Sequence, residues 1–252
     1  MRDMDPGQLA ELLRTVPGRK LFYPCSGQDW VEPIAAFGAF MDQFLFVDIN
    51  YDFDRVPRIQ APGWIRERAE PVAGPLRDAR LYFEEGKLRY RDLTPAWLVE
   101  TYGHRDSGRH IEVTRRRGYG QYALWDLPEA SLGVFFHRGD SGGEGGSNAW
   151  FLADHRLKHK PPQLGQLIRT LRGKLADPAL IVSDGTNSTI PELAESSWKG
   201  REFGPGGRTS PKAQHFEAHG LRWDWVGRMR GDGYGPTWVW RVERLDRPAA
   251  SW

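Results

Sequence analysis

The sequence predicts an α/β fold with a mostly parallel sheet and helices on both of its faces. The first observation is a β, α, β succession, in which apolar runs at 21–24 and 43–50 enclose a segment with helical spacing at 30–40. Continuous apolar runs, without alternation of polar residues, are typical of parallel strands covered on both faces. A second unit of the same order is formed by residues 131–140, 163–175 and 178–185. Because crossovers between parallel strands are right-handed, we expect both units to extend one sheet.

The third observation is a set of alternating segments that predicts antiparallel hairpins. Residues 80–93 alternate about a Glu-Gly-Lys turn, and residues 109–127 alternate about Arg-Gly-Tyr-Gly. A C-terminal hairpin is expected where 221–230 pairs with 237–245. Its tryptophans are expected to pack in the core rather than to form an exposed stacking surface.

The remaining segments connect these elements. An N-terminal helix is expected to begin at Asp5, whose side chain is placed to cap it. Residues 52–78 hold several prolines and no sustained period, which predicts a loop with a short helical piece. Residues 210–220 predict a short helix. We therefore expect a single domain over 1–252, in which 78–127 is a β-hairpin insertion.

The composition is that of an ordinary globular chain. It is 39% hydrophobic and 27% charged, and it holds no apolar run of the roughly 18 residues that a membrane helix needs. A formal net charge of +2 gives little overall attraction to polyanions. Cys25 is the only cysteine, which excludes an internal disulfide, and the first residues lack the apolar core of a secretory signal. We expect a cytoplasmic protein with no membrane partner.

A turn and an acidic strand end carry a resemblance to a known family. The turn PCSGQD at 24–29 follows the first strand, and the second strand reaches Asp48. With the terminal hairpin, this layout resembles the Rossmann-like fold of class I S-adenosylmethionine-dependent methyltransferases over residues 20–51 and 130–245. The resemblance implies methyl transfer, with the turn around the methionine part of S-adenosylmethionine and Asp48 on the ribose hydroxyls. The turn has Gly27 alone, where the family commonly has two or three glycines.

Three more residues of this turn belong to the predicted cofactor site, namely Cys25, Ser26 and Asp29. A helix N-terminus after a strand favours polar or anionic ligand groups. The alternative is local, with Ser26, Gly27 and Asp29 forming a turn and helix cap, and Asp48 capping the next turn. Cys25 is either a thiolate stabilised by the helix or, more commonly, a small buried hydrophobe.

The Gly-rich stretch 137–148 follows a buried strand and combines five glycines with charged residues. Glycines allow positive φ and close backbone approach, which predicts a functional loop, the alternative being a mobile connection. Asp140 and Glu144 are the predicted catalytic residues, acting as a base or as an orienting group for the methyl acceptor. The further cofactor-binding residues predicted at these strand ends are Arg138, Gly139, Ser141 and Asp184.

Two other functions also fit the sequence. One is a non-catalytic module that binds a small nucleotide-type ligand, or RNA or DNA through Arg115, Arg116 and Arg117, which lie beside tyrosines. Charged hairpin ends are, however, usually just solvated, and arginines also protect edge strands. The other is a hydrolase in which the three loop carboxylates hold a divalent ion. The histidines show no metal-site spacing, so no motif predicts a metal.

Overall fold

The computed structural model describes residues 4–48, 50–53, 57–73, 79–84, 87–92, 96–118, 120–138, 167–183, 213–229 and 237–245. The helices in this part are α1 (Pro6–Arg14), α2 (Val31–Phe37), α3 (Gly120–Trp125) and α5 (Leu167–Lys174). The strands are β1 (Lys20–Pro24), β2 (Gln43–Asp48), β3 (Trp64–Ala73), β4 (Ala79–Glu84), β5 (Lys87–Asp92), β6 (Ala96–His104), β7 (His110–Arg117), β8 (Leu132–His137), β9 (Leu175–Ser183), β10 (His215–Ala218), β11 (Leu221–Met229) and β12 (Thr237–Arg244).

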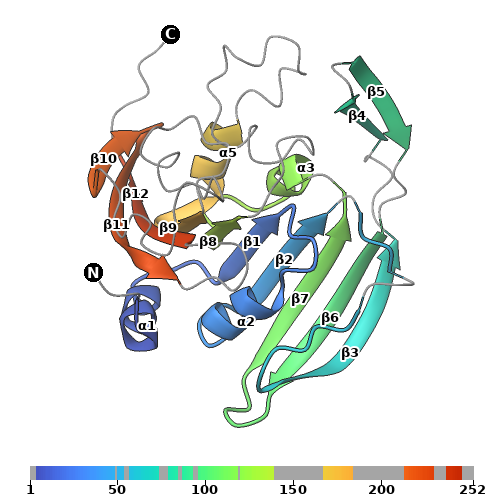
Figure 1. Cartoon of the computed structure of the whole chain (residues 1–252), viewed down its shortest axis with the longest axis horizontal. Coiled ribbons are helices and arrows are strands. Elements are labelled where there is room, and N and C mark those ends of the chain that lie inside the picture. Colours follow the sequence, from blue (N-terminus) through green and yellow to red (C-terminus); the bar gives the residue numbers. More distant parts are fainter. Residues whose placement is uncertain are drawn as a thin grey trace, which may run out of the picture.

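Ten of these strands form one mixed sheet in the order β10-β11-β12-β9-β8-β1-β2-β7-β6-β3 (Figure 1), and β4 and β5 form a separate pair. The five strands from β9 to β7 in this order pair in parallel. The strands outside them pair antiparallel, which makes antiparallel pairings the more numerous kind in the sheet. The described part of the chain is thus rich in strand and poor in helix.

This architecture corrects the predicted fold. The mostly parallel, helix-rich Rossmann-like sheet is wrong, and so is the resemblance to class I methyltransferases, because the sheet is mixed and mostly antiparallel and has few helices. The physical reason is that segments read as loop, insertion or helix instead add strands to the edges of the main sheet. Whether the chain is a single domain over 1–252, with 78–127 as an insertion, stays a prediction.

Two edge strands lie where no strand was expected. The predicted loop at 52–78 contains β3, which pairs with β6 over its whole length at one end of the sheet. Pro71 is tolerated there because an edge strand has a row of N–H groups that need no partner. The helix expected at 210–220 is also wrong, because this segment contains β10, which turns at Gly220 into β11.

The hairpin expected at 109–127 is wrong as well. β7 ends at Arg117, and the residues after it form the helix α3 instead of a returning strand. β7 lies between β6, to which it is antiparallel, and β2, to which it is parallel. The hairpins β4–β5 and β11–β12 are confirmed, and so is the cap of α1, where Asp5 and Gln8 form a reciprocal capping box.

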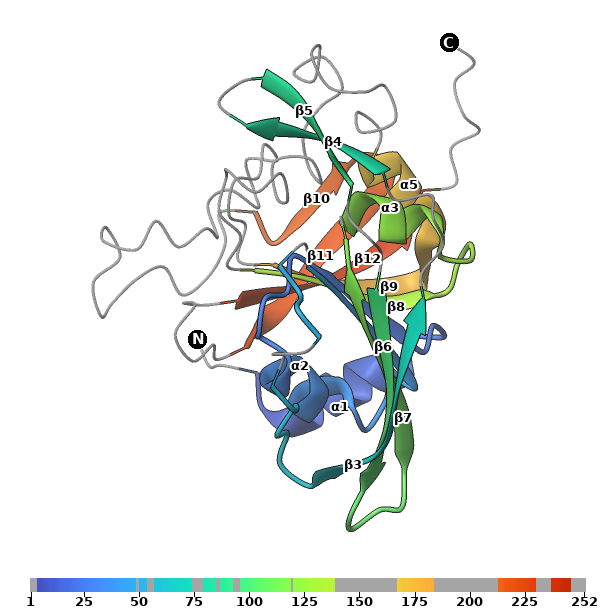
Figure 2. The same cartoon turned by 90° about the vertical axis from the view of Figure 1, so that its right-hand side faces the viewer.

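The core lies on both faces of the sheet. One cluster joins α1 and α2 to side chains of the parallel strands, and the other joins α3 and α5 to the opposite set. α3 and α5 lie close together in both views (Figure 1 and Figure 2). Trp223, Trp238 and Trp240 belong to the second cluster and are at most 1% exposed, which confirms that the tryptophans of this hairpin pack in the core. No helix in the described residues is both long enough and apolar enough to cross a lipid bilayer.

Candidate functional site

The carboxyl ends of β1 and β8 lie at the point where the parallel part of the sheet changes its winding direction. β1 pairs with β2 on one side and with β8 on the other. The chain passes from β1 outward to β2, whereas from β8 it passes outward in the opposite direction to β9. In open sheets of parallel strands, small ligands bind beyond the carboxyl ends at such a point.

The turn after β1 is shaped by two residues with positive φ. Cys25 has φ 54° and Gly27 has φ 50°. A Cβ added to Gly27 would have no atom of the described residues within 4 Å, so these residues leave the space above it open. The N–H of Ser26 donates to Val47 O at 3.1 Å, and that of Gly27 donates to Asp48 Oδ2 at 2.8 Å. The turn is therefore fixed to the tip of β2.

The carboxylate of Asp48 bridges two turns. One oxygen accepts from Gly27 N, and the other accepts from Asn50 N at 2.8 Å. This is the arrangement expected if Asp48 caps the turn after β2. The side chain is only half-buried, and each carboxylate oxygen has a second lone pair, so the same group can also accept from a ligand hydroxyl.

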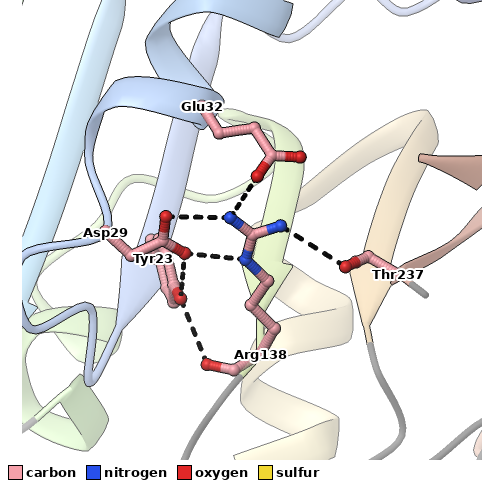
Figure 3. A network of polar contacts seen from close by, with 5 residues as sticks. All are labelled: Tyr23, Asp29, Glu32, Arg138 and Thr237. Carbon is pink, nitrogen blue, oxygen red and sulfur yellow. Dashed lines mark hydrogen bonds and ion pairs between the residues drawn. The ribbon is translucent and has the colours of Figure 1, made fainter. Parts of the chain in front are cut away.

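A network of ion pairs occupies the same edge beside the turn, centred on Arg138 (Figure 3). The guanidinium makes a bidentate pair with Asp29, at 2.7 and 2.8 Å, and contacts Glu32 at 2.5 Å. It also reaches Thr237 Oγ1 at 3.5 Å, and the Tyr23 hydroxyl bridges Asp29 and the Arg138 carbonyl. The network joins the segment from β1 to α2 with the end of β8 and with β12, three parts of the chain that are far apart in the sequence.

Arg138 stays charged in this network. Its side chain is 1% exposed, and burial alone would lower its pKa. Hydrogen bonds and charge from Asp29 and Glu32 more than offset that effect, so the pKa of Arg138 lies above its ordinary value. The predicted role of Asp29 as helix cap is wrong, because α2 has Trp30 as its N-cap residue, without a side-chain hydrogen bond. Asp29 instead neutralises the buried cation.

Buried polar groups continue from the turn toward β7. Ser26 Oγ lies 2.5 Å from the hydroxyl of Tyr51, which also accepts from Trp30 Nε1 at 2.7 Å. The guanidinium of Arg115 lies over the Trp30 ring, 4.8 Å from its centroid. Arg115 in turn pairs with Glu100 through Nε at 2.8 Å. Both of these charged side chains are fully buried.

We expect Tyr51 to make the fold sensitive to alkali. Burial raises the pKa of Tyr51 above its ordinary value of 10.0, an effect that hydrogen bonds from Ser26 and Trp30 only partly oppose. Above about pH 10 the unfolded chain loses this phenolic proton while the folded chain keeps it. The contribution of Tyr51 to the free energy of unfolding is therefore fully present below pH 10. Above pH 10 the free energy of unfolding falls, by up to about 1.4 kcal/mol per pH unit for this tyrosine.

The measurement is urea unfolding of the wild type and of Tyr51→Phe at a series of pH values from 8 to 11.5. Tyr51→Phe should lose stability less steeply above pH 10, by about 1 kcal/mol per pH unit. The same slope in both proteins would show that the hydroxyl titrates alike in the folded and unfolded chains.

The structure brings part of the predicted site together. Backbone and side-chain contacts place the following residues at one edge of the sheet: Cys25, Ser26, Gly27, Asp29, Asp48 and Arg138. The predicted catalytic residues Asp140 and Glu144 lie outside the described residues, as do the predicted binding residues Gly139, Ser141 and Asp184. Their roles stay predictions.

The three consecutive arginines lie along β7 rather than at a hairpin tip. Arg115 is fully buried against Glu100, and Arg116 is 3% exposed, pairs with Asp126 and lies over the ring of Trp97. Arg117 is half-buried. Contact of this segment with RNA or DNA stays a prediction.

Sequence reasoning missed the partners of these charges. Glu32, Glu100 and Tyr51 carry no motif, and only pairing of distant segments brings them to the buried arginines. The described residues contain no group of three or more His, Cys, Asp or Glu side chains close enough to hold a metal ion. The carboxylates considered for a divalent ion are not among those residues.

Comparisons of the chain with protein-family models, with curated proteins and with solved structures find no match.

Proposed function

We propose that the carboxyl edge of the parallel strands binds a small nucleoside-type molecule, with S-adenosylmethionine as the first ligand to test and methyl transfer as the reaction class. The observation that carries the proposal is the hydrogen bond from Gly27 N to Asp48. It joins the turn after β1 to the tip of β2, beside the point where the winding direction changes. A polar or diol-bearing ligand group is favoured there.

Two features make this edge suitable for a nucleoside. The described residues leave open space above Gly27, which would let a flat ligand approach the backbone of the turn closely. The half-buried carboxylate of Asp48 has lone pairs left for two hydroxyls of a ribose. Methyl transfer needs positioning of donor and acceptor more than a specialised nucleophile, so these contacts would serve catalysis by orientation. The cytoplasm is the compartment that we propose for this function.

The test is titration calorimetry with adenosine, S-adenosylmethionine and S-adenosylhomocysteine. We expect micromolar binding of S-adenosylmethionine and S-adenosylhomocysteine, which both carry an amino-acid group, to the wild type. Asp48→Asn should weaken this binding about tenfold or more. The amide has one acceptor oxygen, so it can accept a hydrogen bond from only one side, whereas the carboxylate can accept from both ribose hydroxyls.

The matched control is Asp106→Asn, an exposed residue between β6 and β7 at the opposite edge of the sheet. It should bind each ligand as the wild type does. Absence of heat with all three ligands at millimolar concentration would rule out a nucleoside site at this edge.

A second candidate is a binding module that carries out no reaction, and the network around Arg138 favours it. Arg138, the cation of this network, is already neutralised by Asp29 and Glu32. Binding of adenosine as tight as that of S-adenosylmethionine would support this candidate, since the protein would then make no favourable contact with the methyl-bearing sulfonium group. The form that holds RNA or DNA has less support, because Arg115 and Arg116 are paired with Glu100 and Asp126.

A further inference from the structure

An open pocket of about 440 Å³ lies beside the start of β3, outside the site described above. Residues 58–61 form one wall, Gly63 to Arg66 form another, and Arg105 reaches it from the turn between β6 and β7. The backbone N–H of Arg105 donates to Gly63 O at 2.9 Å, which closes this side of the pocket. Gly63 has φ 78°, and a Cβ there would lie 2.6 Å from the His104 ring, so only glycine fits.

The pocket is lined by three arginines and, among the described residues, by no carboxylate. These are Arg58, Arg66 and Arg105. The side chains of Arg58 and Arg105 are exposed and form no ion pair or hydrogen bond with any described residue. Three guanidinium groups around one hollow repel each other unless an anion lies between them. Their fork-like donors match the oxygens of a phosphate group.

Buried charge behind the pocket adds to this excess. Arg66 Nη1 lies 3.0 Å from Glu100 Oε1, and Arg115 pairs with the other oxygen of the same carboxylate. One anion on β6 therefore pairs with two cations, one on β3 and one on β7. Arg115 Nη2 is buried and has no hydrogen-bond partner among the described residues. Arg66, Arg115 and Glu100 together leave a net positive charge in a region of low dielectric. That charge is screened less, and acts over a longer range, than a charge in water.

Arg115 also fixes the wall that carries Arg58. Its Nη1 donates to the carbonyl of Pro57 at 2.9 Å, directly before Arg58 in the chain. Ile59 is 4% exposed and anchors the same wall in the core, whereas Ile65 is 48% exposed at the pocket. The pocket thus combines cationic groups with an exposed apolar surface, and its volume exceeds that of a phosphate alone.

We infer that this pocket binds the phosphate group of a phosphate monoester, with Arg58 and Arg105 as its direct ligands and Ile65 against the organic part. The site is independent of the proposed nucleoside site. Trp64 pairs with His104 at the end of the sheet where β7 begins, whereas Asp48 pairs with Arg117, where β7 ends. The two sites therefore lie at opposite edges of the sheet and can fail separately.

The experiment is titration calorimetry at an ionic strength of about 10 mM, where screening between exposed charges is weak. The probes are phenyl phosphate, inorganic phosphate and adenosine, the last of which has no phosphate. We expect phenyl phosphate to bind the wild type, and each of Arg58→Gln and Arg105→Gln to weaken it about tenfold. The double variant should lose about a hundredfold. Adenosine should not compete.

The control is the double variant Arg14→Gln, Arg169→Gln, which removes two exposed arginines from α1 and α5. It carries the same change in net charge and should keep its affinity within about twofold. Equal affinity for inorganic phosphate and phenyl phosphate would support Arg58 and Arg105 as phosphate ligands but overturn the contact of Ile65 with an organic part. No binding of either phosphate by the folded wild type, or an equal loss in the control, would overturn the inference.

Discussion

Glu100→Gln is expected to destabilise the protein by about 3–5 kcal/mol, because it removes the carboxylate that pairs with both Arg66 and Arg115. Glu100 and Arg115 are both fully buried, and Arg66 is 21% exposed. Breaking a buried ion pair from one side leaves the other charge desolvated and uncompensated. The glutamine has nearly the same shape, so the loss would report charge rather than packing. The measurement is urea unfolding followed by tryptophan fluorescence.

Glu112→Gln is the matched control, since Glu112 lies on the neighbouring strand β7 and is exposed. Its expected effect is below about 0.5 kcal/mol. Combining Glu100→Gln with Arg115→Met should cost less than the sum of the two single changes, because the second removes the charge that the first leaves unpaired. A loss under about 1 kcal/mol for Glu100→Gln would mean that water reaches Arg115.

Four of the five strands in the parallel centre of the sheet could be predicted from the sequence, whereas β7 and the edges could not. β1, β2, β8 and β9 are buried on both faces, which produces continuous apolar runs. An edge strand covers only part of its surface, so β3 and β10 show no such run. β3 is exposed at most of its positions and contains a proline, and β10 has four residues. Weak burial leaves a weak pattern, and the fold class was misjudged on that account.

The end of β7 shows why alternation alone misleads. Residues 111–116 alternate as an edge or half-buried strand would, and glycines at 118 and 120 look like a hairpin turn. In the structure Gly118 has φ 155° and leads into α3, whose Ala123 and Leu124 are fully buried. The choice between helix and returning strand is decided by the apolar face that α5 offers to α3, a contact distant in sequence.

The position of the candidate site could be predicted from the sequence, but the contacts between its residues could not. The position of the turn after β1 and of Asp48 at the tip of β2 follows from strand order, and the Gly27–Asp48 hydrogen bond joins them. The partners of Arg138 do not follow, because Asp29 lies 109 residues away and matched a local role as helix cap. Charged residues pair with groups that lie close to them in three dimensions, whereas the preference of a residue for a helix cap depends only on its neighbours in the sequence.

Asp29→Asn is expected to destabilise the protein by about 3–4 kcal/mol, since it leaves Arg138 buried with one weaker partner. Asp29 is 9% exposed and makes both bonds of a bidentate pair, whereas Glu32 is 25% exposed and makes one contact. Glu32→Gln should therefore cost about 1 kcal/mol. This ranking follows from burial and from the number of contacts, because both residues carry the same charge and pair with the same guanidinium.

Asp42→Asn provides the control, since Asp42 pairs with Arg109 at a position where the carboxylate is 56% exposed. Exposed pairs contribute at most about 1 kcal/mol, so the same chemical change should have little effect there. The double variant Asp29→Asn, Arg138→Met should recover part of the loss, because no buried charge remains. If Asp29→Asn and Asp42→Asn unfold at the same urea concentration, water reaches Arg138 and stabilises its charge. The ion pairs around Arg138 would then not be what holds β8 against α2 and β12.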